Sequence, residues 1–174
     1  MTNMLSRLIS SRVCDSARRV KAAACVLAAA TIFLSFVLCS STVRAASTLE
    51  TLLIDTASGT RTYQVEVMRT EAERERGLML RPMMPADRGM LFDFGRGDKV
   101  AMWMKDTLIP LDMLFIRKDG TIARITAMTE PMSERILPSG EPVLAVLEIN
   151  GGQSALFGIK EGDIVRHKLF GNVK

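Results

Sequence analysis

Hydrophobic and polar residues alternate in short stretches along most of this chain, a pattern typical of half-buried β-strands. In residues 62–68, for example, Tyr63, Val65 and Val67 alternate with polar residues. Turn-forming residues separate such stretches at intervals of about 8–12 residues, as in all-β domains. The most apolar stretch is residues 143–149, which we expect to be central in a sheet. The predicted strands are 62–68, 90–94, 100–105, 111–116, 121–128, 143–149 and a last one from Ile164.

Local signals predict the turns and two short helices between these strands. Thr70 and Glu73 have capping-box spacing, so their side chains can satisfy backbone N–H groups where a helix begins. A second short helix is predicted at 153–157. Asp119-Gly120 is a strong signal for a tight hairpin. The fold class that follows is mainly β: a small antiparallel β-sandwich or closed barrel with one or two short helices.

The N-terminal part of the chain differs from the rest. Basic residues precede an uncharged apolar run at 22–43, and the small residues of "VRAAS" follow. This order predicts a signal peptide at 1–45, cleaved after Ala45. The apolar run approaches the ~20 residues that span a bilayer, so an uncleaved membrane anchor is the alternative. We therefore divide the chain into this leader, a tether at 46–61 able to add an edge strand, and a β-domain at 62–174. The domain is expected to be periplasmic or secreted, or held at the membrane by the N-terminal segment alone.

Charge and cysteine content change once the leader is set apart. The leader holds six of the 23 basic and one of the 19 acidic residues, so residues 46–174 carry 17 and 18, a net charge of −1. Nucleic-acid binding rests on clustered positive charge, so we expect no nucleic-acid partner. All three cysteines, Cys14, Cys25 and Cys39, also lie in the leader. The remaining chain therefore has no thiol nucleophile and no thiolate metal ligand.

The stretch "AMWMKDTLIPLDMLFI" at residues 101–116 combines the only tryptophan with charged residues and a proline turn. On a strand, Met102 and Met104 share one face, and Trp103 and Lys105 share the other. Residues 111–116 are expected to pair back on strand 100–105, so that the turn brings Asp112 close to Trp103 and Lys105. A charged rim above an apolar floor is typical of a site for a small ligand or peptide. The candidate ligand-binding residues are Arg81, Trp103, Lys105, Asp106, Asp112 and Glu148.

A purely structural interpretation of the same residues stays open. Asp106 and Asp112 lie close to turns, where aspartate commonly accepts hydrogen bonds from backbone N–H groups. Lys105 can lie in solvent with its aliphatic stem along Trp103.

Two further functional alternatives come from the residue types present. A hydrolase could use carboxylates around the same cleft, although no spacing selects a catalytic pair. Met102 and Met104 could carry Cu(I), because thioethers suit that ion. The only histidine, His167, is expected to be exposed on the last strand. One histidine without cysteine gives poor support for zinc, so we predict no metal site and no cofactor.

Three separated blocks of the chain resemble domain-of-unknown-function family 192 (DUF192). They are "RERGLMLRPMMPADRGMLFDF", "WMKDTLIPLDMLFIRKDGTI" and "VLEINGGQSALFGIKEGDIV", and the resemblance covers residues 62–170. It implies a compact, mostly β fold and frequent export, and it brings no established activity. Asp106 stands where the family usually carries asparagine, and a carboxylate only accepts hydrogen bonds. We expect an exported β-domain whose role is non-catalytic binding of a small ligand, a peptide or an envelope protein.

Overall fold

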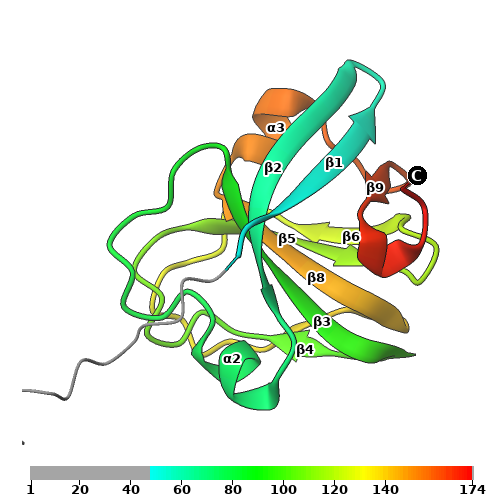
Figure 1. Cartoon of the computed structure of the whole chain (residues 1–174). Coiled ribbons are helices and arrows are strands. Elements are labelled where there is room, and N and C mark those ends of the chain that lie inside the picture. The colour runs from blue at the N-terminus through cyan, green and yellow to red at the C-terminus, as the bar shows by residue number, and fades with distance from the viewer. Residues whose placement is uncertain (1–47, 174) are drawn as a thin grey trace, which may run out of the picture. The chain divides into compact units, whose positions relative to one another are not determined.

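Short strands dominate the folded domain, as the alternating pattern predicts (Figure 1). The computed structural model describes residues 48–173. The predicted leader and its cleavage site lie outside these residues. In chain order the elements are β1 (Glu50–Thr56), β2 (Gly59–Met68), α2 (Glu71–Arg76), β3 (Arg88–Asp98), β4 (Ala101–Met102), β5 (Leu111–Ile116), β6 (Ile122–Thr126), β7 (Leu137–Pro138), β8 (Val143–Asn150), α3 (Gln153–Phe157), β9 (Ile164–Arg166) and a 3-10 turn, η1 (Lys168–Phe170).

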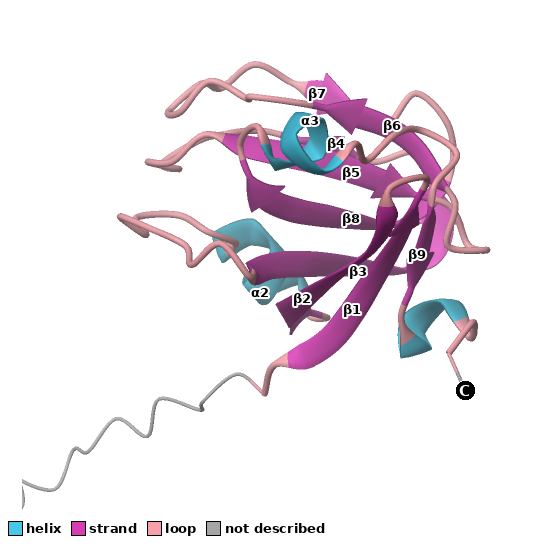
Figure 2. Cartoon of the chain, turned by 90° about the horizontal axis from the view of Figure 1, so that it is seen from above, coloured by secondary structure: helices cyan, strands magenta, loops and turns pink. Residues whose placement is uncertain are grey.

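Seven strands form one sheet in the order β6-β5-β8-β3-β2-β1-β9, and β4 pairs with β7 separately (Figure 2). The mainly β class with two short α-helices is confirmed. The sheet is nevertheless mixed, because β2 and β3 run parallel, with Val65 opposite Gly89. A parallel pair needs a long crossover, and residues 69–87, which include α2, supply it.

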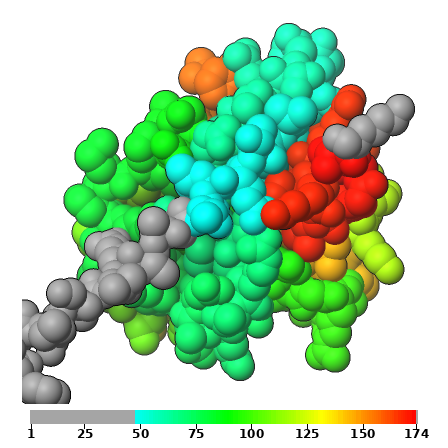
Figure 3. Space-filling model, in the orientation of Figure 1, coloured from blue at the N-terminus to red at the C-terminus, as the bar shows by residue number. Residues whose placement is uncertain are grey.

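The sheet curls into a half-barrel whose two edge strands meet at one point. Thr121 forms a bridge to Ile164, and the Val165 N–H donates to the Gly120 carbonyl at 2.8 Å. Gly120 has a φ of +90°, and a Cβ there would lie 2.5 Å from the Val165 carbonyl oxygen, so this closure requires glycine. Figure 3 shows the C-terminal segment packed against β1 on the surface.

Both faces of the middle strands are buried, so the domain has two apolar cores. Along β8, Leu147 and Ile149 belong to the core of the concave face, together with residues of β1, β2 and β9. Val146 belongs to the core on the opposite face. Glu148 lies on this second face too, because side chains alternate along a strand. The second core consists of Met68, Leu78, Met90, Phe92, Met104, Leu111, Met113, Phe115, Val143 and Val146.

Two segments differ from the sequence-based predictions. Residues 50–56, within the predicted tether, form β1 inside the sheet between β2 and β9, because Leu52 and Ile54 are fully buried in the concave core. The predicted pairing of 100–105 with 111–116 is wrong. β5 pairs with β6 and β8 instead, while β4 ends at Met102 and pairs with β7. Within residues 48–173, no helix has the length and apolar character to cross a membrane.

Candidate functional site

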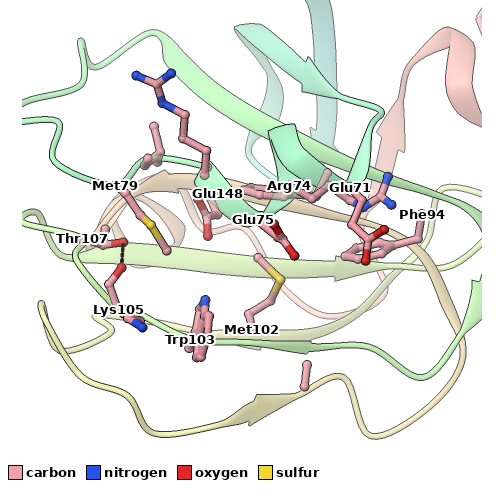
Figure 4. Close-up of a pocket in the computed structure, with 15 residues that line it drawn as sticks. Glu71, Arg74, Glu75, Met79, Phe94, Met102, Trp103, Lys105, Thr107 and Glu148 are labelled. Atoms are coloured by element: carbon pink, nitrogen blue, oxygen red, sulfur yellow. Dashed lines mark hydrogen bonds between the residues drawn. The ribbon is translucent and has the colours of Figure 1, made fainter.

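A pocket of about 390 Å³ opens between α2 and the segment that follows β4, above the second core (Figure 4). Its walls combine aromatic, thioether and charged side chains. It is lined by Glu71, Arg74, Glu75, Arg76, Gly77, Leu78, Met79, Phe92, Phe94, Ala101, Met102, Trp103, Lys105, Thr107 and Glu148.

Glu148 is the buried carboxyl group of this pocket. It lies in β8 between Met90 of β3 and Met113 of β5, which are its partners in register and are both buried. Only 4% of Glu148 is exposed, and within residues 48–173 its carboxyl group has no hydrogen-bond or ion-pair partner. Burial raises its pKa to about 8, because an apolar environment disfavours the charged form. At neutral pH the group is therefore mostly a carboxylic acid, able to donate as well as accept.

One wall of the pocket comes from α2. Thr70 and Glu73 form the predicted capping box, which holds the first turn of this short helix. Arg74 donates hydrogen bonds to the carbonyl oxygens of Arg69 and Asp93, at 2.6 and 2.9 Å. Its guanidinium also lies over the ring of Phe94, 5.5 Å from the centroid. The charged face of α2 is thus fixed against β3 beside the pocket.

The opposite wall comes from the turn after β4. Because the strand ends at Met102, strict alternation stops there, and Met102, Trp103 and Lys105 all line the pocket. The predicted separation of Met102 from Trp103 onto opposite faces is wrong for this reason. Lys105 Nζ lies 5.4 Å from the centroid of the Trp103 ring. In Figure 4 the indole nitrogen of Trp103 and the carboxyl group of Glu148 both point into the pocket. Trp103 is 43% exposed, so its ring is a wall of the pocket open to solvent.

The two methionines considered for Cu(I) have different environments. Met102 lines the pocket, whereas Met104 is buried in the second core. The Sδ atom of Met104 accepts a hydrogen bond from the Thr129 hydroxyl at 3.1 Å. No group of three or more His, Cys, Asp and Glu side chains suited to a metal ion occurs in the described part of the chain.

The structure brings three of the six candidate residues together, namely Trp103, Lys105 and Glu148. Asp106 follows in the same turn with a φ of +53°, and its carbonyl oxygen accepts a hydrogen bond from the Leu80 N–H at 2.8 Å. Its backbone therefore holds the turn against the end of the α2 segment.

Arg81 and Asp112 lie outside this pocket. Arg81 forms a two-pronged ion pair with Glu66, at 2.5 and 2.8 Å. Asp112 is fully buried. One oxygen accepts from the N–H groups of Met128 and Gly152, and the other accepts from the Ser154 N–H, all at 2.8–2.9 Å. Asp112 thus ties two loops to β5, which agrees with the structural interpretation of this residue.

None of the α2 residues that line the pocket, namely Glu71, Arg74, Glu75 and Arg76, is among the six candidates from sequence. They have no distinctive spacing, and the crossover alone brings them to the pocket.

The predicted exposure of His167 is wrong. It is buried, its Nδ1 accepts from the Leu169 N–H, and its Nε2 lies 3.0 Å from Glu50. Burial lowers its pKa, and its ring caps the start of η1, which makes it a structural residue.

Known proteins similar to this chain give a family and a fold. Residues 53–167 match the family DUF192, described as an uncharacterized ACR, COG1430. A crystal structure from Sinorhizobium meliloti 1021, of a protein described as a candidate transcription regulator, is 45% identical with a TM-score of 0.70; the match covers 72% of this chain and 98% of that chain. A protein of unknown function from Novosphingobium aromaticivorans DSM 12444 is 39% identical with a TM-score of 0.67, over 68% of this chain and 85% of that chain. The search of curated proteins gave no match. Because the family match spans more than half of the sequence, this chain belongs to the DUF192 family.

Proposed function

We propose that this protein is an exported, non-catalytic binding domain that receives a small ligand or a peptide side chain in the pocket around Glu148. The observation that carries the proposal is the buried carboxyl group of Glu148, which faces the pocket without a hydrogen-bond partner among residues 48–173. The carboxyl oxygens of Glu148 are not among the fully enclosed unpaired atoms of residues 48–173, so a group that enters the pocket can reach them. A ligand that donates to Glu148 would supply the hydrogen bond that no group of the described domain gives it.

The remaining lining is suited to recognition as well. Trp103, Met79 and Met102 provide apolar and polarisable surface, and Lys105 and the charged residues of α2 lie around it. Ligand pockets commonly combine such apolar walls with a few convergent polar groups, and about 390 Å³ is within their usual range of about 300–1,000 Å³.

Export is part of the proposal and rests on the N-terminal sequence. The basic flank, the apolar run at 22–43 and the small residues before Ala46 support secretion through a signal peptide. The ligand would then be met in the periplasm or outside the cell, or at the membrane surface if the apolar run stays as an anchor.

A hydrolase is the second candidate, and the pKa of Glu148 favours it. A carboxyl group that remains protonated at neutral pH has the state required of a general acid. Glu75 and Glu71 of α2 are the carboxylates that line the same pocket and would have to act as its partner. Both side chains are exposed at the rim, so we rank this candidate below binding.

The description of the Sinorhizobium protein concerns transcription, but the charge of this chain does not favour contacts with DNA. Residues 46–174 carry 17 basic and 18 acidic residues, which gives weak support for binding nucleic acid through phosphate contacts.

The test is a binding screen read by Trp103, the only tryptophan of the chain. We would titrate the purified protein with a panel of amino acids, dipeptides, amines, carboxylic acids and monosaccharides and follow tryptophan fluorescence. Saturable binding that Glu148→Gln weakens, with no chemical change of the compound, is the expected result. Turnover of a panel compound that Glu148→Gln abolishes would select the hydrolase. A panel without any saturable change would contradict both.

A further inference from the structure

We propose that the ligand group received by Glu148 is an ammonium group carried on an aliphatic chain, from a free amine or from a lysine side chain of a peptide. This inference deepens the proposed function and rests on it. It follows from the surroundings of the Glu148 carboxyl group, which lines the pocket and has no hydrogen-bond or ion-pair partner among residues 48–173.

Two of the three cations that line the pocket contact the protein, and the third, Arg76 at the end of α2, is exposed. Arg74 donates to two backbone carbonyl oxygens and lies over Phe94. Lys105 lies over Trp103, with Nζ 5.4 Å from the ring centroid. Neither has an ion pair with Glu148, whose carboxyl group is left as a buried acceptor without a donor inside the described domain.

An ammonium group satisfies such a site better than a neutral donor does. Hydrogen bonds between ionised partners are about twice as strong as neutral ones, and Glu148 lies in an apolar environment between Met90 and Met113, where that difference is largest. An ammonium group also brings no acceptor of its own. A hydroxyl or an amide would bring an oxygen that needs a further donor from the pocket.

The walls fit the rest of such a ligand. Trp103 offers an aromatic ring and Met79 and Met102 offer thioethers, surfaces that pack well on methylene groups. Aromatic rings attract cations, and the two cation–ring contacts of Arg74 and Lys105 in this pocket are instances of that attraction. An aliphatic chain can therefore extend from Glu148 along these side chains towards solvent.

The experiment compares three probes of equal length, n-pentylammonium, n-pentanol and pentanoate, on the purified protein at pH 8.5. Fluorescence of Trp103 reports binding. We expect n-pentylammonium to bind at least about tenfold more tightly than n-pentanol and pentanoate to bind most weakly. Glu148→Gln should reduce the affinity for n-pentylammonium to that for n-pentanol. Glu134→Gln, which removes an exposed carboxylate that does not line the pocket, is the control and should change it less than about threefold.

A second measurement needs no variant. The ammonium pairs with ionised Glu148, whose ionised fraction rises from about one tenth at pH 7 to about nine tenths at pH 9 if its pKa is about 8. The affinity for n-pentylammonium should thus increase roughly ninefold over this range, in which an alkylammonium stays protonated. The other charged groups that line the pocket of Glu148 are Glu71, Arg74, Glu75 and Arg76 of α2 and Lys105 after β4.

The outcomes separate the ligand class from the proposed function. Tighter binding of n-pentanol or pentanoate, or an affinity for n-pentylammonium that falls from pH 7 to pH 9, overturns the ammonium proposal while a binding pocket stands. No response to any of the three probes also overturns it, and the wider panel then decides the proposed function. If n-pentylammonium binds as expected, the peptide Gly-Lys-Gly with blocked termini, whose only ammonium group is that of the lysine side chain, identifies the source. Binding tighter than that of the free amine indicates a lysine side chain, and weaker binding indicates a small amine.

Discussion

Replacing Glu148 by glutamine should change how the stability of the protein depends on pH. Burial raises the pKa of Glu148 in the folded state from 4.5 to about 8. Between these two values the folded state binds a proton that the unfolded state has lost. The free energy of unfolding of the wild type therefore falls as pH rises through this window, whereas below about pH 4.5 and above about pH 8 this contribution is constant. Glutamine has a similar shape and does not titrate.

The size of the effect follows from the shift. One pKa unit corresponds to about 1.36 kcal/mol, so a rise from 4.5 to about 8 amounts to roughly 4–5 kcal/mol. Because only 4% of Glu148 is exposed, solvent screens little of it. The stability of Glu148→Gln minus that of the wild type should rise by this amount between about pH 4.5 and pH 8, with a maximum slope near 1.4 kcal/mol per pH unit.

Urea unfolding at closely spaced pH values measures this difference directly. Subtracting the two curves cancels the titration of all other groups that the variants share. Glu75→Gln, at the exposed rim of the same pocket, should give a difference from the wild type within about 0.5 kcal/mol at every pH. A flat difference curve for Glu148→Gln, or one that changes only below pH 5, would show that the carboxyl group is solvated or paired and would refute the reasoning.

Three further predictions test other parts of the chain. Asp112→Asn should lower the free energy of unfolding by about 2–4 kcal/mol in urea, because it removes charge-assisted hydrogen bonds and leaves buried N–H groups such as that of Ser154 poorly matched; a change below 0.5 kcal/mol would contradict this role. Lys105→Ala should change the free energy of unfolding by less than about 1 kcal/mol, because its contact with Trp103 is partly exposed, but it should alter the fluorescence spectrum of that ring. An unchanged spectrum would show that the Lys105 ammonium group does not lie over the Trp103 ring in solution. N-terminal sequencing of the exported protein should begin at Ala46, whereas recovery of the intact chain in membranes would indicate the anchor and recovery of the intact chain in the cytosol would contradict export.

The elements that could be predicted from the sequence depend on neighbouring residues. The capping box of Thr70 and Glu73 and the hairpin turn at Asp119-Gly120 form as predicted, because each relies on hydrogen bonds or backbone angles within a few residues. The apolar run at 143–149 becomes β8, an interior strand with both faces buried. Because both faces of such a strand are buried, nearly all of its residues are apolar, and this composition identifies it in the sequence.

The pairing of strands was decided by tertiary structure. β5 pairs with β8 instead of with the preceding β4, and β2 pairs in parallel with β3. Alternation shows which residues of a strand share a face, but it does not show which strand lies beside it, because the backbone groups that form the ladder are the same in every strand. The energy that selects the partners comes from burying both faces of the middle strands at once.

In the pocket, too, the sequence predicts some features and only the tertiary structure determines the others. Trp103, Lys105 and Glu148 were candidates from sequence because a lone tryptophan and charges beside apolar strands are conspicuous. Glu148 was expected at a rim, and the structure places it at the floor, between Met90 and Met113 from strands that are distant in sequence. Residue type alone determined that a carboxyl group is present at position 148. The folded sheet and the α2 crossover supply the neighbours of this group, and these neighbours decide whether it is solvated, paired or buried without a donor. Its raised pKa is a property of that environment.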